Sequence, residues 1–224
     1  YDVSRLMTGS MGTLGIILDV SLKTLPLPAS EETLRFEMPE SKAVDMLNRW
    51  AGQPLPVSAS SWHDDELRLR LSGAASAVAA ARARLGGERL NAWEGERHWA
   101  SLREQQHEFF SGLAASDRSL WRLSLPSTTP VTALDRIPGA RLVEWGGALR
   151  WVATGAQAEL VREVATAAGG HATLFRATAD RRASDGVFQP LSATATTIHR
   201  RLKAADRKST RLNSSHVKRS RMPS

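Results

Sequence analysis

The succession of strand-like and helix-like segments constrains the fold of this chain more than any other feature of its sequence. One round of strand, helix, hairpin and helix is followed by a similar series of helix, strand, hairpin, helix and strand, and in each the helix after the hairpin ends at a Gly-Gly pair. Alternating apolar and polar residues predict the strands, apolar residues three and four apart predict the helices, and glycines are typical of helix C-termini. The first round covers residues 32–39, 40–53, 57–73 and 73–87.

The second round starts with a helix that the sequence predicts to run without interruption over residues 96–110. Strands and helices in this order build the ferredoxin-like split βαβ sandwich. We therefore predict an α+β protein in which helices cover an antiparallel sheet, with a weak internal duplication of one such unit. The further predicted segments are a strand at 119–126, a hairpin at 140–155, a helix at 155–170, a strand at 171–178, an irregular segment at 180–197 and a short helix at 195–206.

A glycine-rich segment near the start of the sequence indicates a binding site. Gly9–Gly15 holds three glycines and the hydroxyls of Ser10 and Thr13, and the apolar run Leu14–Leu25 predicts a buried strand after it. Glycine lets a ligand approach the main chain, and free N–H groups beside hydroxyls can cradle a phosphate or a cofactor edge. The segment is neither a P-loop, which needs Gly-Lys-Ser/Thr, nor a Rossmann fingerprint, which needs a helix after the glycines. A tight turn without a ligand is the alternative.

The glycine segment is part of a longer stretch that resembles a known family. Residues 1–28 read YDVSRLMTGSMGTLGIILDVSLKTLPLP. They resemble the end of the FAD-binding domain in FAD-linked oxidases of the vanillyl-alcohol-oxidase type, with Met11 where that family usually has Glu. Five further blocks resemble the FAD-binding E subunits of bacterial glycolate oxidases, and they are residues 48–62, 102–110, 120–127, 144–151 and 169–176.

The resemblance implies a domain organisation and a set of flavin contacts. Residues 1–28 would form the C-terminal end of a PCMH-type FAD-binding domain, and residues 29–203 the ferredoxin-like cap domain of FAD-linked oxidases. The family's flavin pyrophosphate loop is expected upstream of residue 1, so we expect an N-terminally truncated fragment that is inactive alone. The expected FAD-binding residues are Gly9, Ser10, Gly12, Thr13, Leu14, Gly15, Ile16 and Ile17.

The resemblance also implies an enzymatic role. Such subunits act in a complex that oxidises glycolate to glyoxylate, together with a second FAD-binding subunit and an iron–sulfur subunit. The expected location is the cytoplasm, or the inner face of the bacterial membrane where the partners would hold the subunit. Two alternatives stay open: a non-catalytic scaffold subunit of such a complex, which Met11 favours, and a related FAD-linked lactate-type dehydrogenase.

The composition excludes several other classes of function. The sequence has no cysteine, which excludes disulfides, thiol catalysis and cysteine-ligated clusters within it, and no apolar run long enough to cross a bilayer. Residues 207–224 hold six Lys and Arg and no acid, and removing these six from the 30 leaves 24 against 23 Asp and Glu. We therefore expect residues 204–224 to be a disordered basic tail and expect no nucleic-acid partner. KSTRLNSSH in this tail also resembles sequencing-adapter read-through, which suggests an artefactual origin.

His171 is the best sequence candidate for a catalytic residue. Histidine suits proton transfer near neutral pH, and oxidation of a 2-hydroxy acid needs a base for the hydroxyl and cations for the carboxylate. Arg176 lies five residues further on, so the two side chains face opposite sides of a regular strand. A strand-edge histidine without a catalytic role is the alternative.

The remaining histidines do not predict a metal site. His98 and His107 are nine residues apart in the predicted helix 96–110, about two and a half turns, which places them on opposite faces. The run from His63 to Asp65 is predicted to be a solvated hairpin turn. Because no further ligands lie at metal-binding spacing, we expect no metal.

Overall fold

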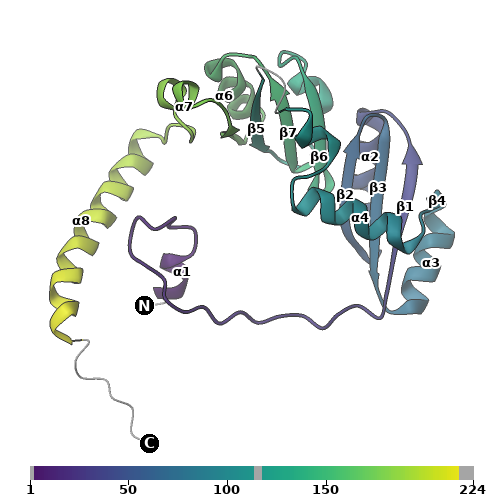
Figure 1. Cartoon of the computed structure of the whole chain (residues 1–224), viewed down its shortest axis with the longest axis horizontal. Coiled ribbons are helices and arrows are strands. Elements are labelled where there is room, and N and C mark those ends of the chain that lie inside the picture. Colours follow the sequence, from purple (N-terminus) through teal and green to yellow (C-terminus); the bar gives the residue numbers. More distant parts are fainter. Residues whose placement is uncertain (1–2, 114–117, 217–224) are drawn as a thin grey trace, which may run out of the picture. The chain divides into compact units, whose positions relative to one another are not determined.

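The structure is a computed structural model that describes residues 3–113 and 118–216, with side chains to residue 205. The chain divides into two compact units. One consists of residues 1–26 together with 190–224, and the other is the continuous stretch 27–189. Figure 1 shows the elements of both.

The first half of the larger unit has the predicted order of elements. Its strands lie in the order β4-β1-β3-β2, and the neighbours are antiparallel. Helices α2 and α3 connect them as in the ferredoxin-like βαββαβ arrangement. The elements are β1 (Ser30–Glu37), α2 (Glu40–Ala51), β2 (Val57–His63), β3 (Glu66–Gly73), α3 (Ala75–Leu85) and β4 (Glu88–Arg89).

The second half repeats this strand order. Read from its outer edge, it runs β8-β5-β7-β6, so the last strand of each half is outermost, followed by the first, third and second. A short 3-10 helix, η1, stands where the first half has α2. The elements are β5 (Ser119–Ser124), η1 (Val131–Leu134), β6 (Ala140–Glu144), η2 (Trp145–Gly147), β7 (Leu149–Thr154), α6 (Ala158–Ala167) and β8 (His171–Arg176).

The two halves join edge to edge into one eight-stranded antiparallel sheet. Strand β2 of the first half pairs with β6 of the second, with Ser61 opposite Glu144 and Trp62 opposite Val143. The α+β class is therefore confirmed, and the duplicated strand order agrees with the predicted internal repeat.

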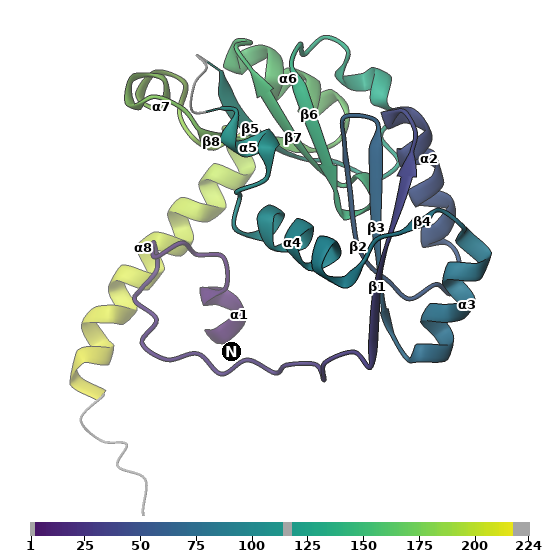
Figure 2. The ribbon, with the colours of Figure 1, turned by 45° about the vertical axis from the view of Figure 1, so that its right-hand side comes forward.

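Helices cover both faces of this sheet. On one face, α2 and α3 form a hydrophobic core with Leu34 and Leu69 of the first half. On the same face, α6 forms a second core with Trp121 of the second half. On the opposite face, α4 (Ala92–Arg103) and α5 (Glu108–Ser111) contribute Leu102, Phe109 and Phe110 to a third core. Figure 2 shows α4 and α2 on opposite sides of the first-half strands.

The predicted helix over residues 96–110 is wrong, because the chain turns in its middle. Helix α4 starts at a capping box in which Asn91 and Glu94 satisfy each other's backbone N–H groups, and it ends at Arg103. Gln105 then adopts a left-handed φ of 55°, and the backbone N–H of His107 returns to the carbonyl of Ser101 (3.1 Å). This turn brings the aromatic residues of α5 back onto the core that α4 already contacts.

The predicted buried strand at Leu14–Leu25 is also wrong. These residues form no strand, and apolar side chains among them are largely exposed, for example Ile16 (88%) and Leu18 (90%). A strand needs a neighbour for its backbone N–H and C=O groups, and none of the described residues pairs with this segment. A short helix, α1 (Val3–Met7), precedes the glycine segment.

The polar C-terminal part is more helical than the sequence predicts. Helix α7 (Ala179–Asp185), capped by Thr178, lies within the segment predicted to be irregular. Helix α8 (Ala193–His216) includes the predicted terminal helix and continues through the first residues of the predicted disordered tail. Residues 217–224 lie outside the described residues. Within the described part of the chain, no helix is both long and apolar enough to span a bilayer.

Candidate functional site

The glycine segment has the backbone conformations that its composition predicts. Gly9 and Gly12 have positive φ angles of 78° and 76°, which glycine adopts without strain, and Met11 between them also has a positive φ of 51°. The segment folds on itself, since the N–H of Thr13 donates to the carbonyl of Ser10 (2.9 Å) and its hydroxyl donates to the same oxygen (2.6 Å).

Much of this segment's hydrogen-bonding capacity is unused. In the described part of the chain, the backbone N–H groups of Gly12 and of Leu14–Ile17 donate no recorded hydrogen bond. The eight residues expected to bind FAD are exposed or half-buried in this structure. Such a row of free N–H groups suits a phosphate or the polar edge of a ring.

A second constellation lies in the larger unit and was not predicted. His63 ends β2, His98 lies in α4, and His107 is the N-cap of α5. The ring centroids of His107 and His63 are 5.5 Å apart, and those of His107 and His98 are also 5.5 Å apart. The expectation that His98 and His107 face opposite ways is thus wrong, because it assumed a single straight helix. The turn at Gln105 brings the two imidazoles together.

His98 is a positioned, neutral imidazole. A guanidinium nitrogen of Arg68 donates to its Nδ1, so its Nε2 carries the proton and donates to the hydroxyl of Ser61 (2.8 Å). Burial, with smaller contributions from the charges of Arg68 and His107, lowers the pKa of His98 to about 3. The ring is therefore uncharged across the physiological pH range, and it fixes α4 to the strands beneath it.

His63 and His107 have defined tautomers. His63 Nδ1 donates to the carbonyl of Arg141 (2.9 Å), which leaves the Nε2 lone pair free. His107 Nδ1 accepts the N–H of Phe109 in a long contact of 3.3 Å. Burial and the neighbouring His63 lower the pKa of His107. His107 is therefore a neutral imidazole that carries its proton on Nε2, and it lies at the edge of an open space.

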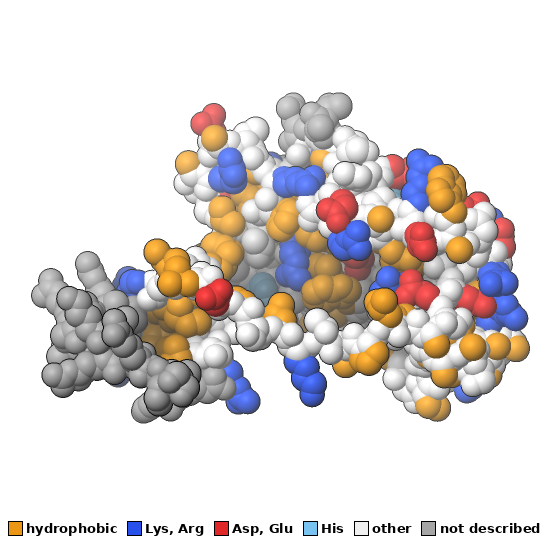
Figure 3. All heavy atoms as spheres, turned by 60° about the horizontal axis from the view of Figure 1, so that its bottom comes forward, with side chains coloured by type: hydrophobic (Ala, Val, Ile, Leu, Met, Phe, Trp, Pro, Cys, Tyr) orange, Lys and Arg blue, Asp and Glu red, His pale blue; other side chains and the backbone are white. Residues whose placement is uncertain are grey.

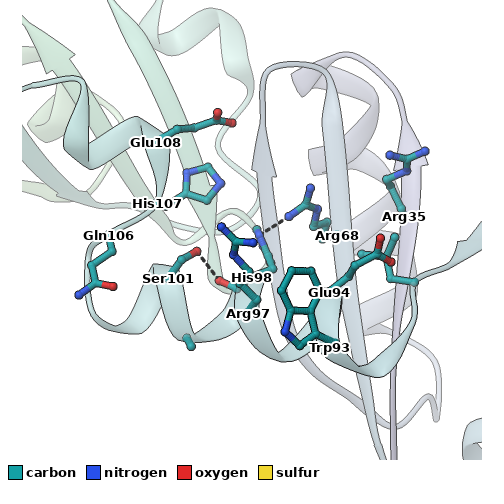
Figure 4. A pocket seen from close by; sticks show the side chains of 12 residues that line it. Arg35, Arg68, Trp93, Glu94, Arg97, His98, Ser101, Gln106, His107 and Glu108 are labelled. Carbon is teal, nitrogen blue, oxygen red and sulfur yellow. Dashed lines mark hydrogen bonds between the residues drawn. The ribbon is translucent and has the colours of Figure 1, made fainter.

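His98 and His107 line an open pocket of about 600 Å³ between α4 and the strands, shown in Figure 4. Among the arginines of this pocket, Arg35 donates a hydrogen bond from Nε to the carboxylate of Glu88 (2.9 Å), and Arg68 forms an ion pair with Glu66. Arg97 stacks over Trp93 at 5.1 Å and has no carboxylate partner among the described residues. The Arg97 guanidinium is thus available to a small anion, although Glu94 and Glu108 also line the pocket.

A smaller cavity of about 130 Å³ adjoins this pocket. Its wall is formed by the β2–β3 turn and the start of α5. The ligand atoms of His63, His107 and Glu108 all lie within 4.8 Å of one another there. This grouping was not predictable from the sequence, because His63 lies far along the chain from His107 and Glu108.

His171 lies apart from both cavities. It is the exposed first residue of β8, opposite Ser124. The β5–β8 register shifts by one residue, so that Arg176 pairs with Leu120 and lies on the same face of the sheet as His171. The expectation of opposite faces is wrong for that reason. The two residues still lie at opposite ends of the strand, roughly 16 Å apart at 3.3 Å per residue.

The distribution of charge is mixed in the larger unit. On the face drawn in Figure 3, Lys and Arg side chains lie interspersed with Asp and Glu side chains. Several charged residues of this unit are paired, as in the ion pairs of Arg136 with Glu163 (2.8 Å) and Arg82 with Glu32 (3.3 Å).

Comparison with known proteins gives one strong similarity. No protein-family model matches the sequence. The chain is 43% identical over 203 residues to glycolate oxidase subunit GlcE of Escherichia coli (strain K12), and the match covers 91% of this chain and 53% of that protein. The chain thus spans about half the length of this curated relative. The resemblance found in separate sequence blocks is confirmed by this match: the chain is similar over nearly its whole length to a subunit of glycolate oxidase.

Proposed function

We propose that this chain is part of an FAD-binding subunit of a glycolate oxidase complex, which oxidises a small 2-hydroxy acid. The observation that carries the proposal is the 43% identity to a glycolate oxidase subunit across 91% of the chain. Two features of the structure support it. One is the glycine segment with its unused backbone donors, and the other is the pocket with an unpaired arginine beside a neutral histidine.

The proposed flavin contacts are backbone N–H groups from Gly12 to Ile17. Such donors bind a phosphate or a flavin ring edge without needing a particular side chain. When bound, FAD would accept the hydride removed from the substrate carbon. The chain's own contribution at this segment is to position the cofactor.

A chimera tests the flavin contacts. The matching 203-residue segment of the Escherichia coli subunit is replaced by that of this chain, and the FAD content of the purified complex is measured. The Gly12→Val variant should lose FAD, because valine is strained at φ 76° and narrows the approach to the backbone. Gly186→Val is the matched control, since Gly186 has a similar φ of 72° and open space but lies outside the segment. Equal FAD content in the two variants would contradict the assignment.

The substrate carboxylate is proposed to bind Arg97, the guanidinium in this pocket that has no carboxylate partner among the described residues. Arg97→Gln in the chimera should raise KM for glycolate by roughly 10- to 100-fold. This corresponds to the loss of about 1.5–3 kcal/mol, the usual contribution of a hydrogen bond to a charged group. The value of kcat should change less, because the group binds the part of the substrate that does not react. An unchanged KM would show that the substrate does not bind in this pocket.

The same chimera separates the alternatives. A complex that assembles without FAD in the chimeric subunit would favour a scaffold role, which the methionine at position 11 suggests. Preferential oxidation of lactate would favour the lactate-type dehydrogenase. The proposed partners are a second flavin subunit and an iron–sulfur subunit, which could also hold the subunit at the membrane. Because the sequence has no cysteine, the cluster's thiolates would come from outside these 224 residues.

A further inference from the structure

We propose that His63, His107 and Glu108 bind a divalent transition-metal ion, with Zn²⁺ the best fit, in the small cavity between the β2–β3 turn and α5. The potential ligand atoms of the three residues lie within 4.8 Å of one another. Two imidazoles and one carboxylate form the ligand set of open zinc sites, in which water or another small ligand completes the coordination.

The hydrogen bond of His63 prepares that residue for a metal. Its Nδ1 donates to the carbonyl of Arg141 (2.9 Å), so the ring orientation is fixed and the Nε2 lone pair is free. Metal-binding histidines usually make such a bond from the other ring nitrogen, because it sets the tautomer and increases the basicity of the ligand.

The other two ligands can adjust at low cost. The His107 Nδ1 contact with the Phe109 N–H is long, 3.3 Å, and it is given up when the ring proton moves to Nδ1 and Nε2 binds the metal. The Glu108 side chain is exposed and makes no recorded hydrogen bond or ion pair in the described part of the chain. Ligands in a tetrahedral zinc site lie roughly 3.4 Å apart, with each about 2.1 Å from the ion. A rotation of Glu108 and a small shift of the short α5 would bring the ligand atoms from within 4.8 Å of one another to this shorter separation.

The charge of the cavity wall favours a cation. Asp64, Glu66 and Glu108 contribute three carboxylates to the lining, and Arg68 contributes one positive charge, which is paired with Glu66. Two carboxylates therefore remain uncompensated beside the histidines. A divalent cation would balance them and would join the hairpin turn to the segment that follows α4.

Metal titration of the 224-residue chain tests the proposal. The chain is stripped with a chelator and titrated with Zn²⁺ by calorimetry, and Co²⁺ is used as an optical probe of the coordination. We expect one Zn²⁺ per chain and the visible absorption of tetrahedral Co²⁺. Glu108→Gln should weaken Zn²⁺ binding at least about tenfold, and His63→Gln should weaken it more, as expected for direct ligands. His199→Gln removes an exposed histidine of α8 and should leave binding unchanged.

Several results would overturn the proposal. They are the absence of saturable Zn²⁺ binding, unchanged affinity in both His63→Gln and Glu108→Gln, or an equal loss in His199→Gln. Glycolate binding that needs these residues while Zn²⁺ does not bind would assign the cavity to an anion. If circular dichroism shows that His63→Gln is unfolded, Glu108→Gln decides, because its exposed carboxylate supports no other contact. The readout contains no flavin, so its failure leaves the proposed oxidase function untouched.

Discussion

A glycine inside helix α4 provides a sharp test of how this helix is held on the sheet. Gly95 is buried, and a Cβ atom added to it would lie 2.8 Å from the hydroxyl oxygen of Thr33 in β1 and 3.3 Å from its Cβ. The same hydroxyl accepts the indole N–H of Trp99 (2.9 Å). Alanine at position 95 therefore requires either α4 or the side chain of Thr33 to move, although alanine is the better helix former.

The expected effect of Gly95→Ala is a balance of opposing contributions. Helix propensity favours alanine by about 1 kcal/mol. Overpacking costs about 1–3 kcal/mol, and loss of the Trp99–Thr33 hydrogen bond costs about 1 kcal/mol more. The variant should therefore lose about 1–3 kcal/mol of unfolding free energy in urea titrations, and each kcal/mol lowers Tm by about 2–4 °C in a domain of 150–250 residues.

Two further variants isolate the cause. Gly155→Ala is the matched control, because that loop glycine has no atom within 4 Å of the added Cβ and an ordinary φ. It should be neutral or gain about 0.4–1 kcal/mol. In the double variant Thr33→Ala with Gly95→Ala, the losses should be less than additive by at least about 0.5 kcal/mol. A Gly95→Ala protein as stable as the wild type would refute the close approach of α4 to β1.

Three other predictions concern stability. Arg150 is fully buried and donates to the carbonyls of Gly147 (3.1 Å) and Thr129, so Arg150→Ala should cost about 3–5 kcal/mol in urea unfolding, and a loss below about 1 kcal/mol would contradict its role. Burial raises the pKa of Glu144, so the folded state holds this proton more tightly, and the resulting stability is lost as pH rises from the ordinary glutamate range through the raised pKa. Glu144→Gln keeps an acceptor for Trp151 and should flatten this decline, whereas parallel pH profiles of the urea midpoint would contradict the assignment. Residues 27–189 expressed alone should show the urea midpoint of the same unit in the whole chain, because they form a separate compact unit, and a large decrease would show that this unit depends on the rest.

The local patterns of the sequence predicted most of the secondary structure. Alternation in residues 66–73 and the apolar face of residues 40–53 depend on neighbours a few positions away, and both elements are present as β3 and α2. The glycine pairs likewise end α3 and α6 near the predicted positions. The resemblance to glycolate oxidase subunits was also readable from the sequence, because it rests on the order of residues alone.

The prediction failed where a segment's conformation depends on what it contacts. Nothing in residues 96–110 marks the break after Arg103 clearly, since helix-forming residues continue through it. The break forms because Phe109 and Phe110 become buried in the core shared with Leu102, and that burial outweighs one further helical turn. The strand predicted at residues 14–25 does not form because no strand among the described residues lies beside it to pair with its backbone.

The sequence by itself determined the α+β class, the repeated order of elements and the similarity to a glycolate oxidase subunit, because these depend on local periodicity and on residue order. Only the tertiary structure decided which titratable side chains meet. His63, His107 and Glu108 converge because the β2–β3 turn and the start of α5 line the same small cavity, a proximity that no spacing along the chain encodes. The same folding places His98 against Arg68 and keeps it neutral, while His171, the sequence's own candidate, lies outside both cavities.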